Sequence, residues 1–198
     1  MFGKKPHRNI KVGLLGGSFN PPHKGHIHVS NQAIKLLGLD ETWWLVSPQN
    51  PLKNTQMADN YEERFKLCQE IAKNHPHINI SGIEDELQTK YSIETIEKLT
   101  AIYPNINFIW IIGSDNLLQM PKWQKWKDIF NIIPIAIFNR EPYSKDALNG
   151  QAAKFFNKNR VAEKNAKSLV GKKVPAWCFL DIEPMNISST KIREENND

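Results

Sequence analysis

The chain of 198 residues carries 26 lysine and arginine residues against 21 acidic ones, a formal net charge of +5. Its length fits one domain, and 40% hydrophobic with 24% charged residues is ordinary for a soluble globular protein. The basic residues are spread along the chain, which argues against a nucleic-acid partner. The longest apolar run, residues 129–138, is too short to span a bilayer. Cys68 and Cys178 fit neither a zinc site nor a disulfide framework, so we expect reduced thiols in a cytoplasmic protein without a membrane partner.

The first predicted strand, residues 10–15, leads into the sequence Gly16-Gly17-Ser18-Phe19-Asn20-Pro21-Pro22-His23-Lys24-Gly25-His26. A helix is predicted directly after it, because Ile27, Ile34 and Leu37 recur near the helical period. Paired glycines let backbone N–H groups approach an anion, and a helix that opens after the two prolines directs its free N–H groups to the same place. This arrangement favours a phosphate-binding site over a plain tight turn.

Two histidines distinguish this turn from other glycine turns. His23 and His26 are three residues apart, so side chains at these positions share a face on the first turn of a helix. Gly25 between them removes a side chain where a ligand could come close. With Lys24 and the helix N-terminus, the two imidazoles suit a polyphosphate better than they suit a merely solvated surface.

The rest of the chain alternates between strand and helix patterns. Strands are predicted at residues 42–46, 78–80, 108–112, 132–138 and 177–180. Helices are predicted at residues 61–72, with Asp59 and Glu62 as a capping box, at 93–99, with Ser92 as N-cap, and from about residue 187. Residues 141–172 are lysine-rich and expected to be helical or loose. Apolar strands that alternate with helices predict an α/β fold: a mostly parallel sheet with helices on both faces.

Ligands of such a sheet bind beyond the carboxyl ends of its strands, and several candidate residues lie there. Lys53 is in the loop after the second strand and could contact a phosphate. Asp115, after Gly113 at the end of a middle strand, could bind a ribose, cap the next helix, or do both. Trp123 could stack on an aromatic ring or simply pack in the core.

A second group of phosphate-binding residue types follows the last strand. Ser188, Ser189 and Thr190 precede Lys191 and Arg193, so hydroxyls, helix N–H groups and cations occur together. The alternative is a serine N-cap with a solvated basic tail. No Walker string, dinucleotide fingerprint or nucleophile elbow is present. The residues therefore favour chemistry in which the protein positions and neutralises charge without forming a covalent bond.

These motifs resemble one known family. The sequence from Gly16 to His26 is similar to the G-G-S-F-D-P-P-H-x-G-H signature of bacterial nicotinate-nucleotide adenylyltransferases. The other matching segments are Ile187-Ser188-Ser189-Thr190-Lys191-Ile192-Arg193, Gly113-Ser114-Asp115 with Leu118 and Trp123, and Tyr91-Ser92-Ile93-Glu94-Thr95. The chain departs from the family pattern at Asn20, where aspartate is usual, at Gln124, where tyrosine often stands, and at Pro48-Gln49-Asn50-Pro51.

The resemblance implies transfer of AMP from ATP to nicotinate mononucleotide, with Mg²⁺, on a single Rossmann-like nucleotidylyltransferase domain at residues 10–193 between flexible segments 1–9 and 194–198. The residues implied in ATP binding are Gly16, Gly17, Ser18, Phe19, His23, Gly25, His26, Ile187, Ser188, Ser189 and Thr190. Those implied in binding the nicotinate nucleotide are Asn20, Lys53, Ser92, Asp115 and Trp123, with Trp123 on the pyridine ring and Ser92 at its carboxylate. The implied catalytic residues are His23, His26, Lys53 and Arg193.

Two alternatives stay open beside this interpretation. A sister enzyme would use phosphopantetheine or nicotinamide mononucleotide as the acceptor of AMP. A protein of another class would bind a nucleotide or RNA without catalysis, although no clustered basic face or aromatic ladder supports that. Whether the chain forms a homo-oligomer is also open.

Overall fold

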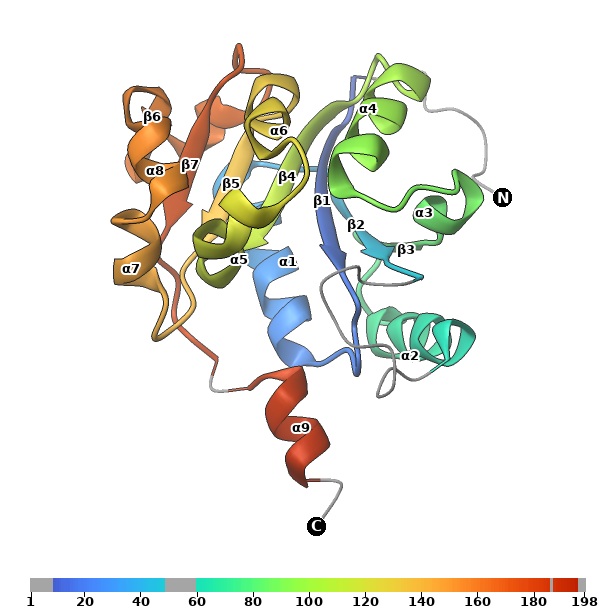
Figure 1. Ribbon diagram of the computed structural model, residues 1–198. Helices are drawn as coiled ribbons and strands as arrows, with labels where there is room; N and C mark the ends of the chain where they lie inside the picture. The colour runs from blue at the N-terminus through green and yellow to red at the C-terminus, as the bar shows by residue number, and fades with distance from the viewer. Residues whose placement is uncertain (1–8, 49–59, 186, 196–198) are drawn as a thin grey trace.

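A computed structural model describes residues 9–48, 60–185 and 187–195 of the chain. In these residues one sheet of seven strands has the order β3-β2-β1-β4-β5-β7-β6, and every pair of neighbours is parallel (Figure 1). The strands are β1 (Lys11–Gly17), β2 (Glu41–Val46), β3 (Ile78–Ser81), β4 (Asn107–Gly113), β5 (Ile135–Phe138), β6 (Arg160–Val161) and β7 (Trp177–Leu180). The chain builds outward in one direction from β1 and in the other from β4. The crevice that ligands use in such sheets therefore opens beyond the carboxyl ends of these two strands.

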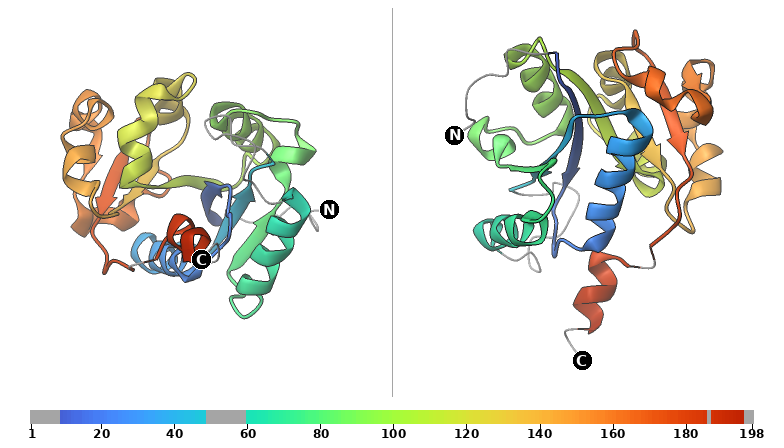
Figure 2. Two further views of the ribbon diagram at one scale, coloured as in Figure 1. Left: turned by 60° about the horizontal axis from the view of Figure 1, so that its bottom comes forward. Right: turned by 180° about the vertical axis from the view of Figure 1, so that it is seen from behind.

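Helices cover both faces of the sheet, as predicted (Figure 2). One face carries α1 (Lys24–Leu37), α2 (Tyr61–Ala72) and the 3₁₀ segment η4 (Glu163–Leu169). The other carries α3 (Ile83–Glu86), α4 (Ser92–Ile102), α5 (Ser114–Gln119), η2 (Met120–Lys122), α6 (Trp126–Ile132), α7 (Ser144–Leu148) and α8 (Gln151–Phe155). A short η3 (Asn157–Asn159) precedes β6, and α9 (Ser189–Glu195) lies at the carboxyl edge, end to end with α1.

Each strand contributes to two apolar cores because successive side chains point to opposite faces. In β4, Trp110 lies in the core under α4 to α8, whereas Ile109 and Ile111 lie in the core under α1 and α2. Cys68 and Cys178 are buried and free in the second of these cores, and burial raises the pKa of the two thiols to about 12 and about 11. Their thiol forms are therefore favoured at neutral pH.

Three local predictions need correction. The strand predicted at 132–138 begins only at Ile135, because Ile132 completes the last turn of α6 and Pro134 separates the two elements. Helix α4 begins at Ser92 itself, with Tyr91 in the N-cap position and Glu94 accepting hydrogen bonds from the backbone N–H groups of residues 90 and 91. Helix α2 is capped by the side chain of Asn60, and Asp59 lies outside the described residues. The edge strand β6 was not predicted.

The indole of Trp44 joins α1 to the centre of the sheet. Trp44 is fully buried in β2, and its Nε1–H donates to the hydroxyl of Ser30 in α1 at 2.8 Å. Ser30 is fully buried as well. This polar pair inside an apolar layer fixes the rotation of α1 about its axis and, with it, the direction of the residues at the start of the helix.

We expect Ser30→Ala to lower the free energy of unfolding by about 1–3 kcal/mol, because the indole N–H of Trp44 loses its acceptor in a place that water does not reach. Ser168→Ala is the matched control: its exposed hydroxyl donates to the carbonyl of Asn165, and its loss should change stability by less than about 0.5 kcal/mol. Chemical denaturation measures both. Equal losses in the two variants would contradict the proposed importance of the buried pair.

Candidate active site

The turn after β1 is shaped by aromatic rings on both sides of the sheet. A Cβ at Gly16 would approach the ring of Trp110 to 3.1 Å. Phe19 takes a left-handed backbone conformation with φ 47° and is 2% exposed, stacked on Trp44 at a centroid distance of 4.9 Å. The ring of Phe19 is therefore part of the apolar core that α1 and α2 cover.

His23 and His26 cap the first turn of α1 reciprocally. Nδ1 of His23, in the N-cap position, accepts from the N–H of Gly25 at 3.1 Å, and Nδ1 of His26 accepts from the N–H of His23 at 3.1 Å. The two ring centroids are 3.9 Å apart. The prediction that both histidines share a face at the helix start is confirmed, although His23 precedes the first turn instead of belonging to it.

This capping determines where each imidazole carries its proton. A nitrogen that accepts from an N–H cannot be protonated, so the proton of each neutral ring is on Nε2. In the described part of the chain neither Nε2 bonds to another residue. Burial lowers the pKa of His23 to about 4, and nearby Arg140 acts in the same direction. Burial, then His23 and Arg140, lower the pKa of His26 to about 3. Both rings are therefore neutral donors at neutral pH.

The structure explains the glycine at position 25 differently from the sequence analysis, which expected it to leave room for a ligand. A Cβ at this position would lie 2.8 Å from Nδ1 of His23 and 3.2 Å from Cγ2 of Ile187. The space above the glycine is thus occupied by the ring of His23, which must lie flat over the helix start to accept its hydrogen bond. The glycine permits the cap, whether or not a ligand also approaches.

The segment at the start of α9 bonds directly to the turn after β1. The hydroxyl of Ser189 donates to the carbonyl of Pro21 at 2.9 Å, and the guanidinium of Arg193 donates to the carbonyl of Asn20 and to the hydroxyl of Thr190. Ser188 accepts from the N–H of Lys191 at 3.2 Å, as an N-cap would. The two motifs that the sequence separates by 160 residues or more therefore meet at one place, where α9 supports the turn that carries the histidines.

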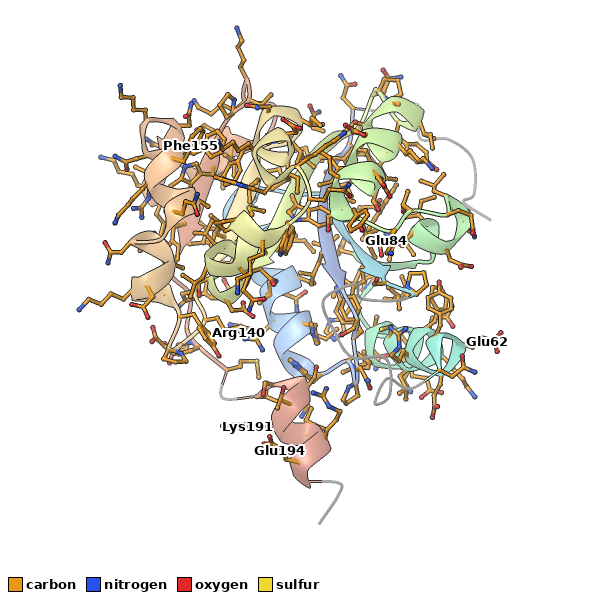
Figure 3. All side chains as sticks on the ribbon, viewed as in Figure 1. Glu62, Glu84, Arg140, Phe155, Lys191 and Glu194 are labelled. Atoms are coloured by element: carbon orange, nitrogen blue, oxygen red, sulfur yellow. The ribbon has the colours of Figure 1, made fainter. Side chains whose placement is uncertain are left out.

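At the start of α5, Asp115 forms an ion pair with Arg140. Oδ2 of Asp115, in the first turn of α5, lies 2.9 Å from a guanidinium nitrogen of Arg140, which follows β5 (Figure 3). The other oxygen, Oδ1, is buried without a hydrogen-bond partner among the described residues. The helix is capped by Gly113, so the alternative role of Asp115 as N-cap is wrong. Asp115 thus leaves one carboxylate oxygen unsatisfied in the described residues, at the carboxyl end of β4.

Sequence reasoning missed two arginines. Arg140 supplies a cation near both imidazoles, and its place directly after a predicted strand was the available signal. Arg64 of α2 is 2% exposed and donates to the carbonyls of Ser18 and Pro48, so it ties the turn after β1 to the end of β2. The signal for Arg64 was a cation on the buried face of a predicted helix.

The residues predicted to bind the nicotinate nucleotide are more dispersed than those predicted to bind ATP. Asn20 is 7% exposed within the turn itself. Ser92 begins α4, and Trp123 packs half-buried against the core on the same face of the sheet. Neither shares a hydrogen bond with the histidine turn in the part of the chain that is described. Lys53 lies outside the described residues, so its prediction has no structural counterpart here.

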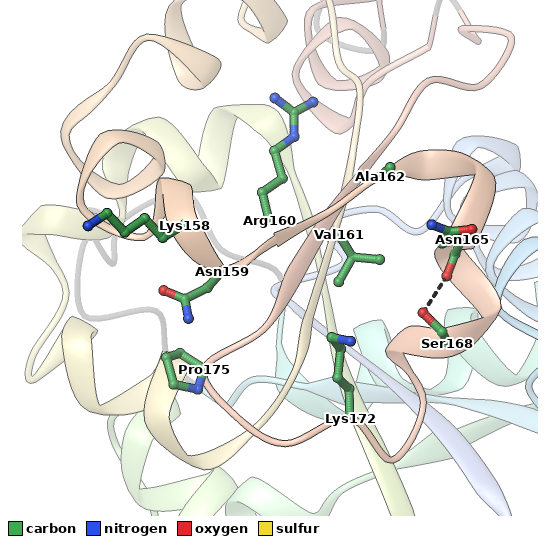
Figure 4. Close-up of a pocket in the computed structure, with 9 residues that line it drawn as sticks. All are labelled: Lys158, Asn159, Arg160, Val161, Ala162, Asn165, Ser168, Lys172 and Pro175. Atoms are coloured by element: carbon green, nitrogen blue, oxygen red, sulfur yellow. Dashed lines mark hydrogen bonds between the residues drawn. The ribbon is translucent and has the colours of Figure 1, made fainter.

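The structure also has a hollow of about 350 Å³ beside β6, the strand at one lateral edge of the sheet (Figure 4). Its lining includes Lys158, Arg160 and Lys172, from the lysine-rich segment. Arg160 stacks over Trp177 at 5.2 Å, and Lys158 points away from the hollow, so the cations do not converge on one ligand position. Within the described ranges, no helix is long and apolar enough to cross a membrane.

The fold and the site together agree with the comparisons to known proteins. The cytidylyltransferase-like family matches residues 14–195. A relative from Parvibaculum lavamentivorans, named "Probable nicotinate-nucleotide adenylyltransferase", is 42% identical over 185 residues, which cover 93% of this chain and 92% of the relative. A relative of the same name from a Bradyrhizobium species is 43% identical over 184 residues, covering 93% and 95%.

A solved structure of Plasmodium falciparum nicotinic acid mononucleotide adenylyltransferase complexed with NaAD aligns with a TM-score of 0.69 and 17% identity, over 93% of this chain and 83% of that one. At that identity the likeness concerns the fold. The chain is a nucleotidyltransferase of the cytidylyltransferase-like family. Within that family it belongs with the nicotinate-nucleotide adenylyltransferases, as its resemblance predicted.

The lowered pKa values predict acid sensitivity. Between about pH 4 and pH 6.5 the unfolded chain binds protons at His23 and His26 that the folded chain does not bind, so the free energy of unfolding falls as the pH falls through this window. His26→Gln removes one of these groups and keeps an acceptor suited to the capping position. We expect this variant to reduce the pH dependence of the free energy of unfolding by about 1 kcal/mol per pH unit between pH 6 and pH 5. An unchanged slope, measured by urea unfolding at each pH, would mean that His26 is protonated in the folded protein.

Proposed function

We propose that this enzyme transfers AMP from ATP to nicotinate mononucleotide and forms deamido-NAD and pyrophosphate, a step of NAD biosynthesis. The observation that carries the proposal is the pair of reciprocally capped imidazoles, which present two uncharged N–H donors at the N-terminus of α1. Donors fixed in this way, beside a helix N-terminus, suit the phosphate oxygens of a nucleotide. The names of the relatives support the choice of acceptor.

The reaction needs no general base. The phosphate monoester of the acceptor is already an anion at neutral pH, and one of its oxygens attacks the α-phosphorus of ATP. A new P–O bond forms there while the bond from the α-phosphorus to the bridging oxygen of the β-phosphate breaks, and pyrophosphate leaves with that electron pair. Catalysis then consists of in-line alignment and stabilisation of charge on the phosphate oxygens. Neutral His23 and His26 are suited to this role because they donate throughout the neutral pH range.

The remaining residues divide into those for ATP and those for the acceptor. On the ATP side, the start of α9 bonds to the turn that carries the histidines, and Arg140 adds positive charge. The N–H groups of Gly17 and Ser18 would bind phosphate oxygens. On the acceptor side, the carboxylate of Asp115 would accept from a ribose hydroxyl. Trp123 would stack on the pyridine ring, Ser92 and the neighbouring N–H groups would meet the nicotinate carboxylate, and Lys53 would contact the acceptor phosphate.

Mg²⁺ is proposed to enter the site bound to ATP. In the described residues no group of three metal-ligating side chains gathers, so these residues do not form a resident metal site of their own. The ion would be held by the triphosphate and by water, and it would neutralise charge on the departing pyrophosphate. Every protein contact in this proposal therefore goes to the nucleotides.

A panel of acceptors tests the substrate assignment. Pyrophosphate release from ATP with Mg²⁺ should be at least about tenfold faster in kcat/KM with nicotinate mononucleotide than with nicotinamide mononucleotide, because donors placed for a carboxylate discriminate against the amide. Phosphopantetheine should give no release. Equal rates with both pyridine nucleotides would contradict the assignment of nicotinate mononucleotide as the acceptor. No pyrophosphate release with any acceptor would contradict the proposed adenylyltransferase activity.

The proposed role of the histidines as hydrogen-bond donors to phosphate is tested by His26→Gln, which keeps an acceptor for the helix cap. His26→Gln should lower kcat by about 100-fold because it removes one positioned Nε2–H donor, while the melting temperature at pH 7.5 stays close to that of the wild type. Lys35→Gln, at an exposed position in the last turn of α1, should retain nearly full activity. A wild-type kcat in His26→Gln would exclude a catalytic donor at this position.

A further inference from the structure

The segment after β7 carries the chain from the sheet to α9 (Figure 1). Its described residues, 181–185, 187 and 188, lie in no helix or strand. Such a segment keeps one path where other elements bind its backbone, because its own residues supply no ladder of hydrogen bonds. Two side chains bind this segment, and neither has a role so far in the fold or in the proposed catalysis: Asn139 and His28.

Asn139 directly follows β5, and its side chain continues the pairing of β5 with β7. The paired register ends at Phe138 and Leu180, and the N–H of Asn139 donates to the carbonyl of Leu180 at 3.0 Å. Beyond that point, Oδ1 of Asn139 accepts from the N–H of Ile182 at 3.0 Å, and Nδ2 donates to the carbonyl of Ile182 at 2.9 Å. Nδ2 also donates to Oδ1 of Asp181 at 2.6 Å. The amide group therefore fixes the direction in which the chain leaves β7.

His28 binds the same segment from α1. Its Nε2 lies 2.9 Å from the carbonyl oxygen of Glu183. A carbonyl oxygen only accepts, so Nε2 must carry a proton and donate. His28 stands two residues after His26, on the helix whose start carries the candidate site. This bond therefore joins the segment after β7 to the element that presents the two imidazoles.

The contacts of the segment and of α9 with α1 follow one order. The partners met in turn have falling residue numbers: Glu183 bonds to His28, Ile187 lies against Gly25, Ser189 bonds to Pro21, and Arg193 bonds to Asn20. The chain after β7 thus runs antiparallel to α1 in a single register. Because the backbone between two contacts has a limited reach, the early contacts restrict where the later ones can form.

We propose that Asn139 and His28 are positioning residues for the ATP side of the site: together they set the register in which the segment after β7 lies along α1, and so the place where the start of α9 meets the turn after β1. The inference rests on the proposed function, in which the start of α9 belongs to the ATP side. A shift of that start displaces its hydroxyls and N–H groups from the phosphates and weakens ATP binding first.

Steady-state kinetics of the full chain test the role of His28. His28→Ala should raise the KM for ATP by about fivefold and change the KM for nicotinate mononucleotide by less than about twofold. His28→Gln, whose amide N–H can donate to the same carbonyl, should keep the KM for ATP within about twofold of the wild type. The matched control is His77→Ala, which should behave as the wild type. The ring of His77 also bonds to a backbone carbonyl, that of Asp40, but at the amino-terminal ends of β2 and β3.

An exchange of amide and carboxylate tests the role of Asn139. Asn139→Asp sets a second carboxylate against that of Asp181 and removes the donor to Ile182, so it should raise the KM for ATP by about tenfold. Asn139→Asp combined with Asp181→Asn pairs an amide with a carboxylate again. The double variant should bring the KM for ATP back to within about threefold of the wild type.

Hydrogen exchange separates this inference from the proposed function. In His28→Ala and in Asn139→Asp, the amides of residues 187–195 should exchange about threefold faster than in the wild type, with those of the central strands unchanged. Unchanged exchange at residues 187–195, an unchanged KM for ATP, or an equal rise of both KM values in His28→Ala overturns the inference. A wild type that releases no pyrophosphate with any acceptor overturns the proposed function and, with it, the role in ATP binding.

Discussion

The site depends on one reciprocal interaction, in which His23 and His26 each accept a backbone N–H at the start of α1. The same bonds satisfy free donors of the helix, hold two rings 3.9 Å apart, and leave the proton of each ring on Nε2. Other features serve this arrangement. Gly25 provides room for the ring of His23, Trp44 packs beside His26, and Ser30 fixes Trp44. The structural cap and the pair of donors proposed for catalysis are therefore the same two side chains.

The surroundings of this device follow from the topology of the sheet. Because β1 and β4 are adjacent and the chain departs from them in opposite directions, their carboxyl ends leave a crevice between the turn after β1 and the turn after β4. The histidines and α9 lie at the first turn, and Asp115 with Arg140 lies at the second. In the proposed reaction the two nucleotides would be held at these two turns, and the guanidinium of Arg140 pairs with Asp115 at the second turn.

The regular parts of the fold were predictable because they follow from local pattern: apolar runs predicted the central strands, and the glycine–histidine sequence predicted the turn after β1 and the start of α1. Tertiary contacts decided the rest. Ser189 and Arg193 bind the backbone of Pro21 and Asn20, a pairing that no local pattern indicates. The neutrality of the imidazoles follows from burial and from the position of Arg140, which appear only in the folded chain. The strand predicted from Ile132 failed because an apolar run continues across the end of α6.

The tautomer of the two imidazoles tests this account most directly. A long-range ¹H–¹⁵N NMR spectrum of the full chain at about pH 6.5, with the two rings assigned through His26→Gln and His23→Asn, reports which ring nitrogen carries the proton. The account predicts that His23 and His26 are both neutral, with the proton on Nε2, and that neither titrates above about pH 5. A proton on Nδ1 of either ring, or a doubly protonated ring at this pH, would contradict it.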